Sequence, residues 1–233
     1  MDRALRGSAA HVLVADVRVP VLDPDTAHHL RRVLRLREGA AVTVTDGAGS
    51  WRPGVFTGAG VEAAGDAATV PRADPPLTIA VAPPKGDRLD WLVAKATEVG
   101  IDRIVLLEAE RSVVRLQPER TERRLGRLHR IAAEAAMQSR RVWLPAIDGP
   151  EPAGEWLARG VVAEPGGRQL SAGDTTVVIG PEGGWSEREL AGAADTVSLA
   201  ATVLRVETAA VAAATLLTAL RSTCVSELGA RSG

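Results

Sequence analysis

A proline-rich segment at residues 71–76 divides this chain of 233 residues into two parts with different patterns. Proline removes a backbone donor and interrupts helices and strand pairing, so neither kind of element is expected to continue through the segment. Short apolar runs with turn residues dominate before it, whereas strand-like runs alternate with helix-like segments after it. We therefore expect a small domain at residues 1–73 and a larger one at residues 74–233.

The part before the break is expected to form a small β-barrel with one helix. β-Branched residues, alternation and the turn dipeptide Asp46-Gly47 predict strands at residues 11–19, 41–45, 51–57 and 67–70. The helical spacing of Leu30, Val33 and Leu34 predicts a helix at residues 25–36. Arginines lie in or just after it, at positions 31, 32, 35 and 37. They form either a solvated helix face or a phosphate-binding surface, because guanidinium groups match phosphate oxygens.

The alternation after the break predicts an α/β domain with a mostly parallel sheet that helices cover on both faces. Strands are expected at residues 77–82, 103–107, 161–163, 175–179 and 196–199. Helices are expected at residues 87–99, 118–141, 186–194 and 208–220. Such sheets bind ligands at the loops that follow the carboxyl ends of their strands.

Composition excludes several classes of protein. Cys224 is the single cysteine, which excludes a disulfide framework, and no His, Asp and Glu cluster has the spacing of metal ligands. The longest apolar run, residues 209–220, is too short to cross a bilayer, and the first residues lack the apolar core of a signal peptide. We therefore expect a cytoplasmic protein with no metal and no membrane attachment.

The net charge of −1 excludes a uniformly basic surface for nucleic acid, but the charge is unevenly distributed. Residues 111–141 hold nine Arg and three Glu, a net charge of +6, which leaves −7 for the rest of the chain. A local basic helix is therefore expected, and it is compatible with an RNA partner.

Residues 177–186 are the sharpest candidate for a ligand site. An apolar strand runs into Gly180-Pro181-Glu182-Gly183-Gly184, and Ser186 with Glu189 has the spacing of a capping box at a helix start. Glycines allow a ligand to approach the backbone closely. The loop matches neither the P-loop nor the dinucleotide-binding pattern, so an ordinary strand–helix turn is the alternative.

Charged residues elsewhere in the chain have either a structural role or a role in contacting a substrate. Arg205 and Glu207 stand between apolar neighbours, where a charge is expensive unless it is paired. They either pair with each other, cap the helix that follows, or place Arg205 against a charge of the substrate or product. Lys85 follows a predicted strand, at the ligand-facing end, whereas Lys95 and Glu98 are expected to form a surface ion pair. Arg140 suits the end of a helix electrostatically, and with Gln138 it is also placed to reach a substrate.

Taken together, these segments resemble the RsmE family of bacterial ribosomal RNA methyltransferases, within the SPOUT superfamily. The resemblance runs over nearly the whole chain, and the order and spacing of its segments are more specific than any one of them. It is carried by residues 29–35, 46–47, 84–87, 95–100, 110–114, 134–140, 179–184 and 203–208.

The resemblance implies a PUA-like β-barrel, an α/β domain with a trefoil knot, and a homodimer. It implies S-adenosyl-L-methionine as cofactor and methylation of a uridine N3 in 16S rRNA of the small ribosomal subunit. The implied catalytic residues are Arg205, Glu207 and Arg140. The implied cofactor-binding residues are Glu164, Pro165, Ile179, Gly180, Pro181, Glu182, Gly183, Leu199, Ala200, Ala201, Val203 and Leu204. The implied RNA-binding residues are Arg31, Arg32, Arg35, Lys85, Arg111 and Gln138.

The implied chemistry gives each catalytic residue a task. Uracil N3 carries an imide proton and is a poor nucleophile until that proton leaves. A cation near the uracil oxygens favours the deprotonated imide, and Arg205 is the first candidate for it, followed by Arg140. Glu207 either orients Arg205 or accepts the proton. Pairing hides N3 in a duplex, so the target uridine is expected to be unpaired or flipped out.

The sequence departs from the family pattern at residues 199–201, where Leu-Ala-Ala replaces Leu-Gly-Pro. If the missing glycine gives room to the cofactor, Ala200 narrows the site, and if the position needs a positive φ, alanine is also strained. Val206 replaces a usual threonine. The departure at Ala200 and Ala201 motivates one alternative, an RNA-binding ribosome-assembly factor that has lost catalysis. A second alternative is a SPOUT ribose 2′-O-methyltransferase, against which residues 203–208 argue.

Overall fold

The computed structural model describes residues 2–114 and 118–231, with side chains as far as residue 222. The chain divides into two compact units. The first unit consists of Met1–Ala73 and Ala133–Leu144, and the second of Asp74–Ala132 and Pro145–Gly233. The chain therefore leaves the first unit after Ala73 and returns to it for twelve residues, which no pattern in the sequence indicated.

The second unit is built on a six-stranded sheet with the order β11-β9-β10-β6-β7-β8, in which every neighbouring pair is parallel. This confirms the predicted parallel sheet. The strands are β6 (Thr78–Val81), β7 (Arg103–Glu108), β8 (Ala146–Pro152), β9 (Val161–Arg168), β10 (Thr176–Ile179) and β11 (Asp195–Val197). The central strands β6, β10 and β7 are almost wholly buried, as expected of a sheet covered on both faces.

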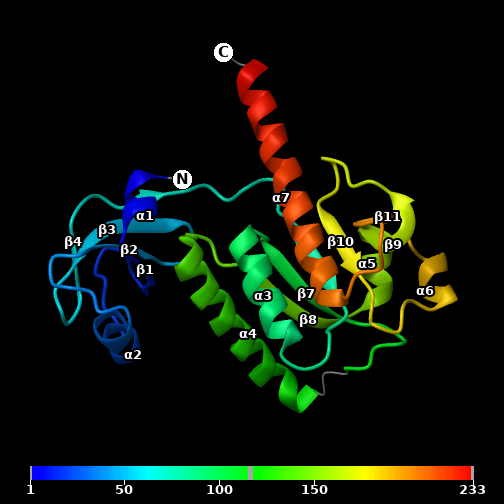
Figure 1. The fold of residues 1–233 in the computed structure, drawn as a ribbon, viewed down its shortest axis with the longest axis horizontal. Helices are drawn as coiled ribbons and strands as arrows, with labels where there is room; N and C mark the ends of the chain where they lie inside the picture. The colour runs from blue at the N-terminus through cyan, green and yellow to red at the C-terminus, as the bar shows by residue number, and fades with distance from the viewer. Residues whose placement is uncertain (1, 115–117, 232–233) are drawn as a thin grey trace. The chain divides into compact units, whose positions relative to one another are not determined.

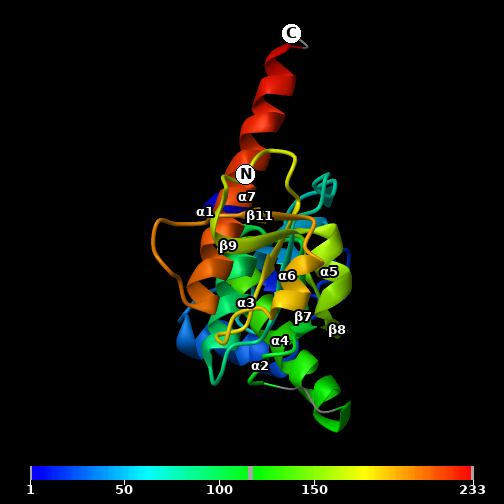
Figure 2. The same cartoon turned by 90° about the vertical axis from the view of Figure 1, so that its right-hand side faces the viewer.

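Helices cover both faces of this sheet (Figures 1 and 2). Helices α3 (Arg88–Val99), α4 (Pro118–Ser139) and α7 (Val206–Arg231) contribute to one apolar core with β6, β7 and β10, and α5 (Ala153–Arg159) packs on the other face. The short helix α6 (Glu187–Ala191) follows β10. Because each helix follows a parallel strand, the helices begin where the strands end. We call this side of the unit the carboxyl edge.

The first unit holds a five-stranded sheet, in which β1 pairs with β2 in parallel and the other pairs are antiparallel. Its strands are β1 (Ala10–Leu13), β2 (Ala41–Thr45), β3 (Ser50–Phe56), β4 (Val61–Ala63) and β5 (Ala68–Thr69). Phe56, Val12 and Val44 lie at the centre of its core. A short helix, α1 (Arg3–Gly7), precedes β1.

The helix predicted at residues 25–36 is present as far as Val33, but it is not α-helical throughout and it ends three residues early. The structure has α2 (Pro24–His28) followed by one π-helical turn, η1 (His29–Val33). Arg35 has a φ of 51°, which ends the helix, because non-glycine residues rarely continue in the left-handed region. Leu30 alone of this segment is fully buried, so little packing supports a longer helix.

The structure also contains β8 and α5, which the sequence did not predict. The sequence of β8 includes Gly149, Pro150 and Pro152, which resemble a turn. Proline is tolerated there because β8 lies at the edge of the sheet and pairs only with β7, so that one side of its backbone needs no ladder partner. The predicted strand at residues 161–163 is longer than expected and continues to Arg168 as β9.

His11 makes the first unit sensitive to acid. Its ring is buried, and Nε2 donates to the carbonyl oxygen of Arg141 over 3.1 Å in the neutral form. Burial, assisted by the charge of Arg140, lowers the pKa of His11 from 6.5 to about 4. The unfolded chain therefore binds a proton near pH 6.5 that the folded unit does not bind until about pH 4.

We expect this histidine to remove stability as the pH falls from 6.5 to 4, by roughly 3 kcal/mol in total. Chemical unfolding at several pH values measures the effect. In the variant His11→Gln this part of the pH dependence is absent, and the remaining slope comes from the carboxylates. Identical pH profiles for the wild type and the variant would contradict the expectation.

Candidate active site

A cavity of about 500 Å³ opens at the carboxyl edge of the second unit. Three walls form it: the middle of β9, the loop between β10 and α6, and the segment that joins β11 to α7. Arg88, the first residue of α3, completes the lining. The other lining residues are Ala163, Glu164, Pro165, Ile179, Gly180, Pro181, Glu182, Gly184, Ser198, Leu199, Ala200, Thr202, Val203, Leu204, Arg205, Val206 and Ala209.

The cavity brings together most of the residues expected to hold the cofactor. Of that set, Gly183 and Ala201 alone do not line it, and the remaining residues come from all three walls. The wall at β9 contributes Glu164, and burial raises the pKa of its carboxyl group. Their contact with a cofactor stays a prediction, but the sequence segments that suggested it do meet at one place.

The loop after β10 is held in shape by a buried tryptophan. The N–H of Gly184 donates to the carbonyl oxygen of Pro181 over 2.8 Å, which closes the turn, and Gly184 has a φ of 70°. A Cβ on Gly180 would lie 2.8 Å from the indole of Trp185, which is only 4% exposed. Glycine at position 180 therefore allows the loop to pass closely over Trp185.

The predicted capping box at the start of α6 is confirmed. The N–H of Glu189 donates to Ser186 Oγ over 3.1 Å, and the N–H of Ser186 donates to Glu189 Oε2 over 2.8 Å. The other carboxylate oxygen of Glu189 accepts the N–H of Glu110 over 2.9 Å. The capping box thus also anchors the loop after β7 beside the cavity loop.

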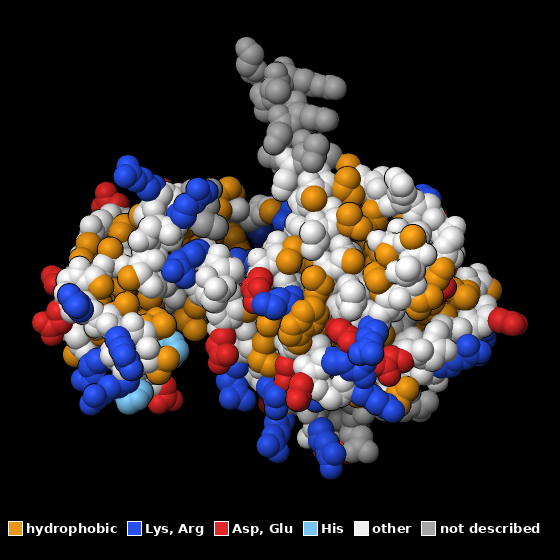
Figure 3. Space-filling view, in the orientation of Figure 1, with side chains coloured by type: hydrophobic (Ala, Val, Ile, Leu, Met, Phe, Trp, Pro, Cys, Tyr) orange, Lys and Arg blue, Asp and Glu red, His pale blue; other side chains and the backbone are white. Residues whose placement is uncertain are grey.

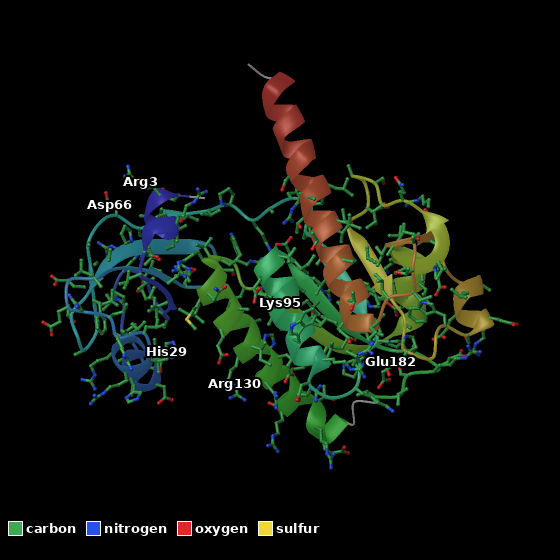
Figure 4. The ribbon with its side chains drawn as sticks, in the orientation of Figure 1. Arg3, His29, Asp66, Lys95, Arg130 and Glu182 are labelled. Atoms are coloured by element: carbon green, nitrogen blue, oxygen red, sulfur yellow. The ribbon has the colours of Figure 1, made fainter. Side chains whose placement is uncertain are left out.

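Arg88 links two carboxylates at the cavity. Its Nη1 lies 2.5 Å from Glu182 Oε1 and 3.7 Å from Glu207 Oε2, and its Nε donates to the carbonyl oxygen of Lys85 over 3.0 Å. Glu207 is 8% exposed, and its Oε2 accepts no hydrogen bond within the part of the chain that the structure describes. Figure 4 shows Glu182 near the end of α7 at which that helix begins.

Sequence reasoning missed Arg88. The signal that could have found it is its place directly after the Lys85-Gly86-Asp87 loop, at the first position of a helix that begins at the carboxyl edge. The alternative that Arg205 and Glu207 pair with each other is wrong, because Glu207 faces Arg88. Arg205 is exposed and lines the cavity, and its carbonyl oxygen accepts the N–H of Ala209 in the first turn of α7.

Arg140 and Gln138 are not among the residues that line this cavity, and both belong to the first unit. The guanidinium of Arg140 donates to the carbonyl oxygens of Ser8, Met137 and Gln138, and Arg140 has a φ of 63°. These bonds secure the end of α4.

The remaining predicted RNA-binding residues are exposed. Arg31, Arg32 and Arg35 lie on the first unit, and Lys85 lies in the loop before α3. Arg111 is exposed as well, and its Nη1 donates to the carbonyl oxygen of Trp185 over 3.0 Å. The predicted ion pair between Lys95 and Glu98 is confirmed, with Nζ 2.8 Å from Oε1.

Ala200 lines the cavity without backbone strain. The only non-glycine residues with positive φ in the described ranges are Arg35 and Arg140, so Ala200 does not adopt the left-handed conformation. A need for positive φ therefore does not explain the glycine that the family pattern has at this position. The difference from the family pattern is therefore the methyl group of Ala200 at the cavity wall. This methyl group takes up space in the cavity and does not strain the backbone.

We expect Ala200→Gly to tighten cofactor binding by about threefold to tenfold, because the side chain at the wall is removed. The same change lowers stability by about 0.5–1 kcal/mol through chain entropy. Calorimetric titration with S-adenosylmethionine measures the first effect, and thermal unfolding measures the second. Ala201→Gly is the matched control, since Ala201 does not line the cavity. Equal affinity gains in both variants would contradict the assignment.

Among the residues that the structure describes, no group of three or more His, Cys, Asp and Glu side chains is placed to hold a metal ion. None of their helices combines the length and the apolar character that crossing a membrane requires.

Comparison with known proteins extends over both units. Residues 72–218 match the RNA methyltransferase domain family, and residues 22–62 match the RNA methyltransferase PUA domain family. The chain is 32% identical to ribosomal RNA small subunit methyltransferase E of Mycobacterium bovis, with 84% of each chain covered. It is also 32% identical to the Synechocystis protein of the same name, with 83% of this chain and 70% of that one covered.

Solved structures show the same architecture. The chain is similar to ribosomal RNA small subunit methyltransferase E from Neisseria gonorrhoeae bound to S-adenosyl methionine, with a TM-score of 0.76 and 27% identity over 91% of this chain and 97% of that one. It is also similar to a probable rRNA methyltransferase from Porphyromonas gingivalis, with a TM-score of 0.74 and 29% identity over 92% and 99% of the two chains.

Proposed function

Because this chain belongs to the RNA methyltransferase family that includes ribosomal RNA small subunit methyltransferase E, we propose that it methylates N3 of a uridine in 16S rRNA with S-adenosylmethionine as donor. The fold expected for that activity, a PUA-type domain and a SPOUT-type α/β domain, is the fold of the chain. The observation that carries the proposal is the cavity at the carboxyl edge, with Arg205 and the Gly180–Gly184 loop in its walls.

The cavity suits the cofactor in size and chemistry. A volume of about 500 Å³ lies in the usual range for a nucleoside-sized ligand. Apolar side chains of Ile179, Leu199 and Leu204 suit an adenine ring, and the carboxylate of Glu164 suits a positive charge of the cofactor, whereas the charge of Glu182 is compensated by Arg88. When bound, S-adenosylmethionine supplies an electrophilic methyl group.

Arg205 and Glu207 are proposed to prepare the uracil. The exposed guanidinium of Arg205 has no ion pair among the residues that the structure describes, so it is free to stabilise negative charge on the uracil oxygens as the imide proton leaves. Glu207 offers Oε2 as a buried acceptor without a hydrogen bond of its own. The guanidinium of Arg88 lies between the carboxylates of Glu207 and Glu182 and forms an ion pair with each of them, which holds both in position.

The first unit is proposed to contact RNA outside the reacting nucleotide. Residues 1–73 include the part that matches the PUA family, and Arg31, Arg32 and Arg35 are exposed on it. Guanidinium groups in such a position bind phosphate oxygens without reading bases. Arg140 and Gln138 remain proposed substrate contacts.

We expect the double variant Arg32→Glu and Arg35→Glu to weaken binding to 16S rRNA and to lower the salt dependence of binding. Because two arginines no longer neutralise phosphates, the slope of log K against log salt falls by about 1.5 to 2. A filter-binding titration at several salt concentrations measures it. Arg6→Glu with Arg159→Glu makes the same charge change at two other exposed arginines. A slope equal to that of the wild type would show that Arg32 and Arg35 form a solvated surface and do not contact phosphates.

A homodimer is also proposed, and α7 supports it. From Thr208 to Leu220 this helix carries no charged residue, although Thr208, Thr215 and Leu216 are exposed. An uncharged helix face in contact with water is the kind of surface that a second copy covers. Light scattering after gel filtration tests this, and a monomer mass at micromolar concentration would contradict it. Since the relatives are named for ribosomal RNA, the proposed location is the cytoplasm.

The decisive experiment compares nucleosides of small-subunit RNA from a strain with and without the protein. The proposal expects 3-methyluridine to disappear in the deletion strain and to return when this chain is supplied. Loss of a 2′-O-methylated nucleoside would favour a ribose methyltransferase. Unchanged nucleosides, together with no calorimetric binding of millimolar S-adenosylmethionine, would favour a non-catalytic assembly factor.

A further inference from the structure

Four arginines form a single exposed row along α4. Arg120, Arg123, Arg127 and Arg130 follow one another at intervals of three, four and three residues, which places them on the same face of a helix. All four are exposed, and the row is about 15 Å long at a rise of 1.5 Å per residue. Figure 3 shows Lys and Arg side chains along the side of the second unit on which α4 lies. In Figure 4 the side chain of Arg130 points outward from α4. We call these four residues the arginine row.

Three charges of the arginine row are not neutralised. Arg127 forms an ion pair with Asp90 in the first turn of α3, so its charge is compensated. Arg120, Arg123 and Arg130 form no ion pair within the described residues. Glu134 lies one turn beyond Arg130 on the same face and ends the row. Arg115, which belongs to the same basic stretch of sequence, lies outside the described residues.

The arginine row begins at the same edge as the cavity. Helix α4 follows β7 and α3 follows β6, so both helices start at the carboxyl edge. The ion pair between Arg127 and Asp90 joins the first part of α4 to the first turn of α3. Arg88, two residues before Asp90, lines the cavity. Arg127, the third residue of the row, therefore lies near the edge at which the cavity opens.

The chemistry of the row indicates a nucleic-acid backbone as its ligand. Guanidinium groups donate to phosphate oxygens in pairs, and three unpaired charges in a line match successive negative charges along one strand. The row contains no aromatic residue on which a base could stack, so it is suited to phosphates and not to bases.

We infer that the arginine row binds the phosphate backbone of the rRNA strand that leads to the cavity. This inference rests on the proposed function and adds to it the surface of the second unit that receives the RNA. The row acts without regard to sequence, so it contributes affinity and orientation while the cavity selects the nucleotide.

The test is a salt titration of binding between the full-length protein and a 16S rRNA transcript. The triple variant Arg120→Gln, Arg123→Gln, Arg130→Gln is expected to lower the slope of log K against log salt by about 2 to 3 and to weaken binding roughly 100-fold at 0.1 M salt. Its cofactor dissociation constant and its thermal midpoint are expected to equal those of the wild type, because the three side chains are exposed and distant from the core.

Two control variants accompany it. Arg159→Gln removes an exposed arginine at the last residue of α5, at the end of that helix away from the carboxyl edge. This variant is expected to leave the slope unchanged. The triple lysine variant at positions 120, 123 and 130 keeps the charge and is expected to keep the slope. If the lysine variant loses as much slope as the glutamine variant, altered folding of α4 explains the effect and the inference is overturned.

The outcomes separate this inference from the proposed function. A wild-type protein that methylates 16S rRNA, combined with a glutamine variant whose salt slope is unchanged, overturns the arginine row alone. A wild-type protein that neither binds nor methylates 16S rRNA overturns the proposed function and the inference with it.

Discussion

Replacing Arg205 with alanine is expected to lower methyl transfer by about 10²–10³-fold, while the cofactor dissociation constant changes by less than about threefold. The reason is that Arg205 lines the cavity with an exposed guanidinium and makes no ion pair within the described residues. Its charge is therefore available to the uracil as negative charge develops, which matters in the transition state and little in cofactor binding. Single-turnover assays and calorimetry measure the two quantities separately.

The matched control for this prediction is Arg88→Ala. Arg88 is the other cation of the cavity, but it is engaged by Glu182 and Glu207. Its loss disturbs the carboxylates and the loop after β10, so cofactor binding and turnover are expected to fall together. If Arg205→Ala shows this same pattern of equal losses, the role assigned to Arg205 is wrong.

The largest effect on stability is expected from Asp102→Ala, a loss of about 3–5 kcal/mol in the free energy of unfolding. Asp102 Oδ2 accepts the N–H of Leu77 over 2.9 Å and lies 2.5 Å from Arg221 Nη1, and both side chains are largely buried. Removing the carboxylate leaves the charge of Arg221 and the N–H of Leu77 in a poorly solvated place. Urea unfolding with a constant m-value measures the loss.

A double-mutant cycle separates the ion pair from the packing of the two side chains. Arg221→Met keeps the aliphatic part of the side chain and removes its charge. In that background Asp102→Ala is expected to destabilise the protein by at least 1 kcal/mol less, as residues in direct contact usually couple by about 0.5–3 kcal/mol. Additive effects of the two substitutions would show that the ion pair contributes nothing.

Local patterns predicted the cavity loop well. The apolar strand before Gly180 and the capping box at Ser186 are properties of neighbouring residues, so they are legible in the sequence and present in the structure. The same holds for the parallel sheet, because alternation of strand and helix leaves few other arrangements.

Contacts between distant residues were not predictable in this way. The partner of Glu207 is Arg88, more than a hundred residues earlier, and only the packing of α3 beside α7 brings them together. Similarly, the helix predicted at residues 25–36 is too long, because the helical spacing of apolar residues continues although the backbone turns out of the helix at Arg35 and Leu30 alone is fully buried. The edge strand β8 was missed because its prolines resemble a turn unless its position in the sheet is known.

The return of residues 133–144 to the first unit has a consequence for dissecting this protein. The carbonyl oxygen of Val142 accepts the N–H of Gly49 over 2.8 Å, and the N–H of Leu144 donates to the carbonyl oxygen of Gly47 over 2.9 Å. A fragment cut after Ala73 lacks these partners and the acceptor of His11 as well. The small domain is thus completed by a segment synthesised only after most of α4, so it can reach its final hydrogen bonding only late in translation.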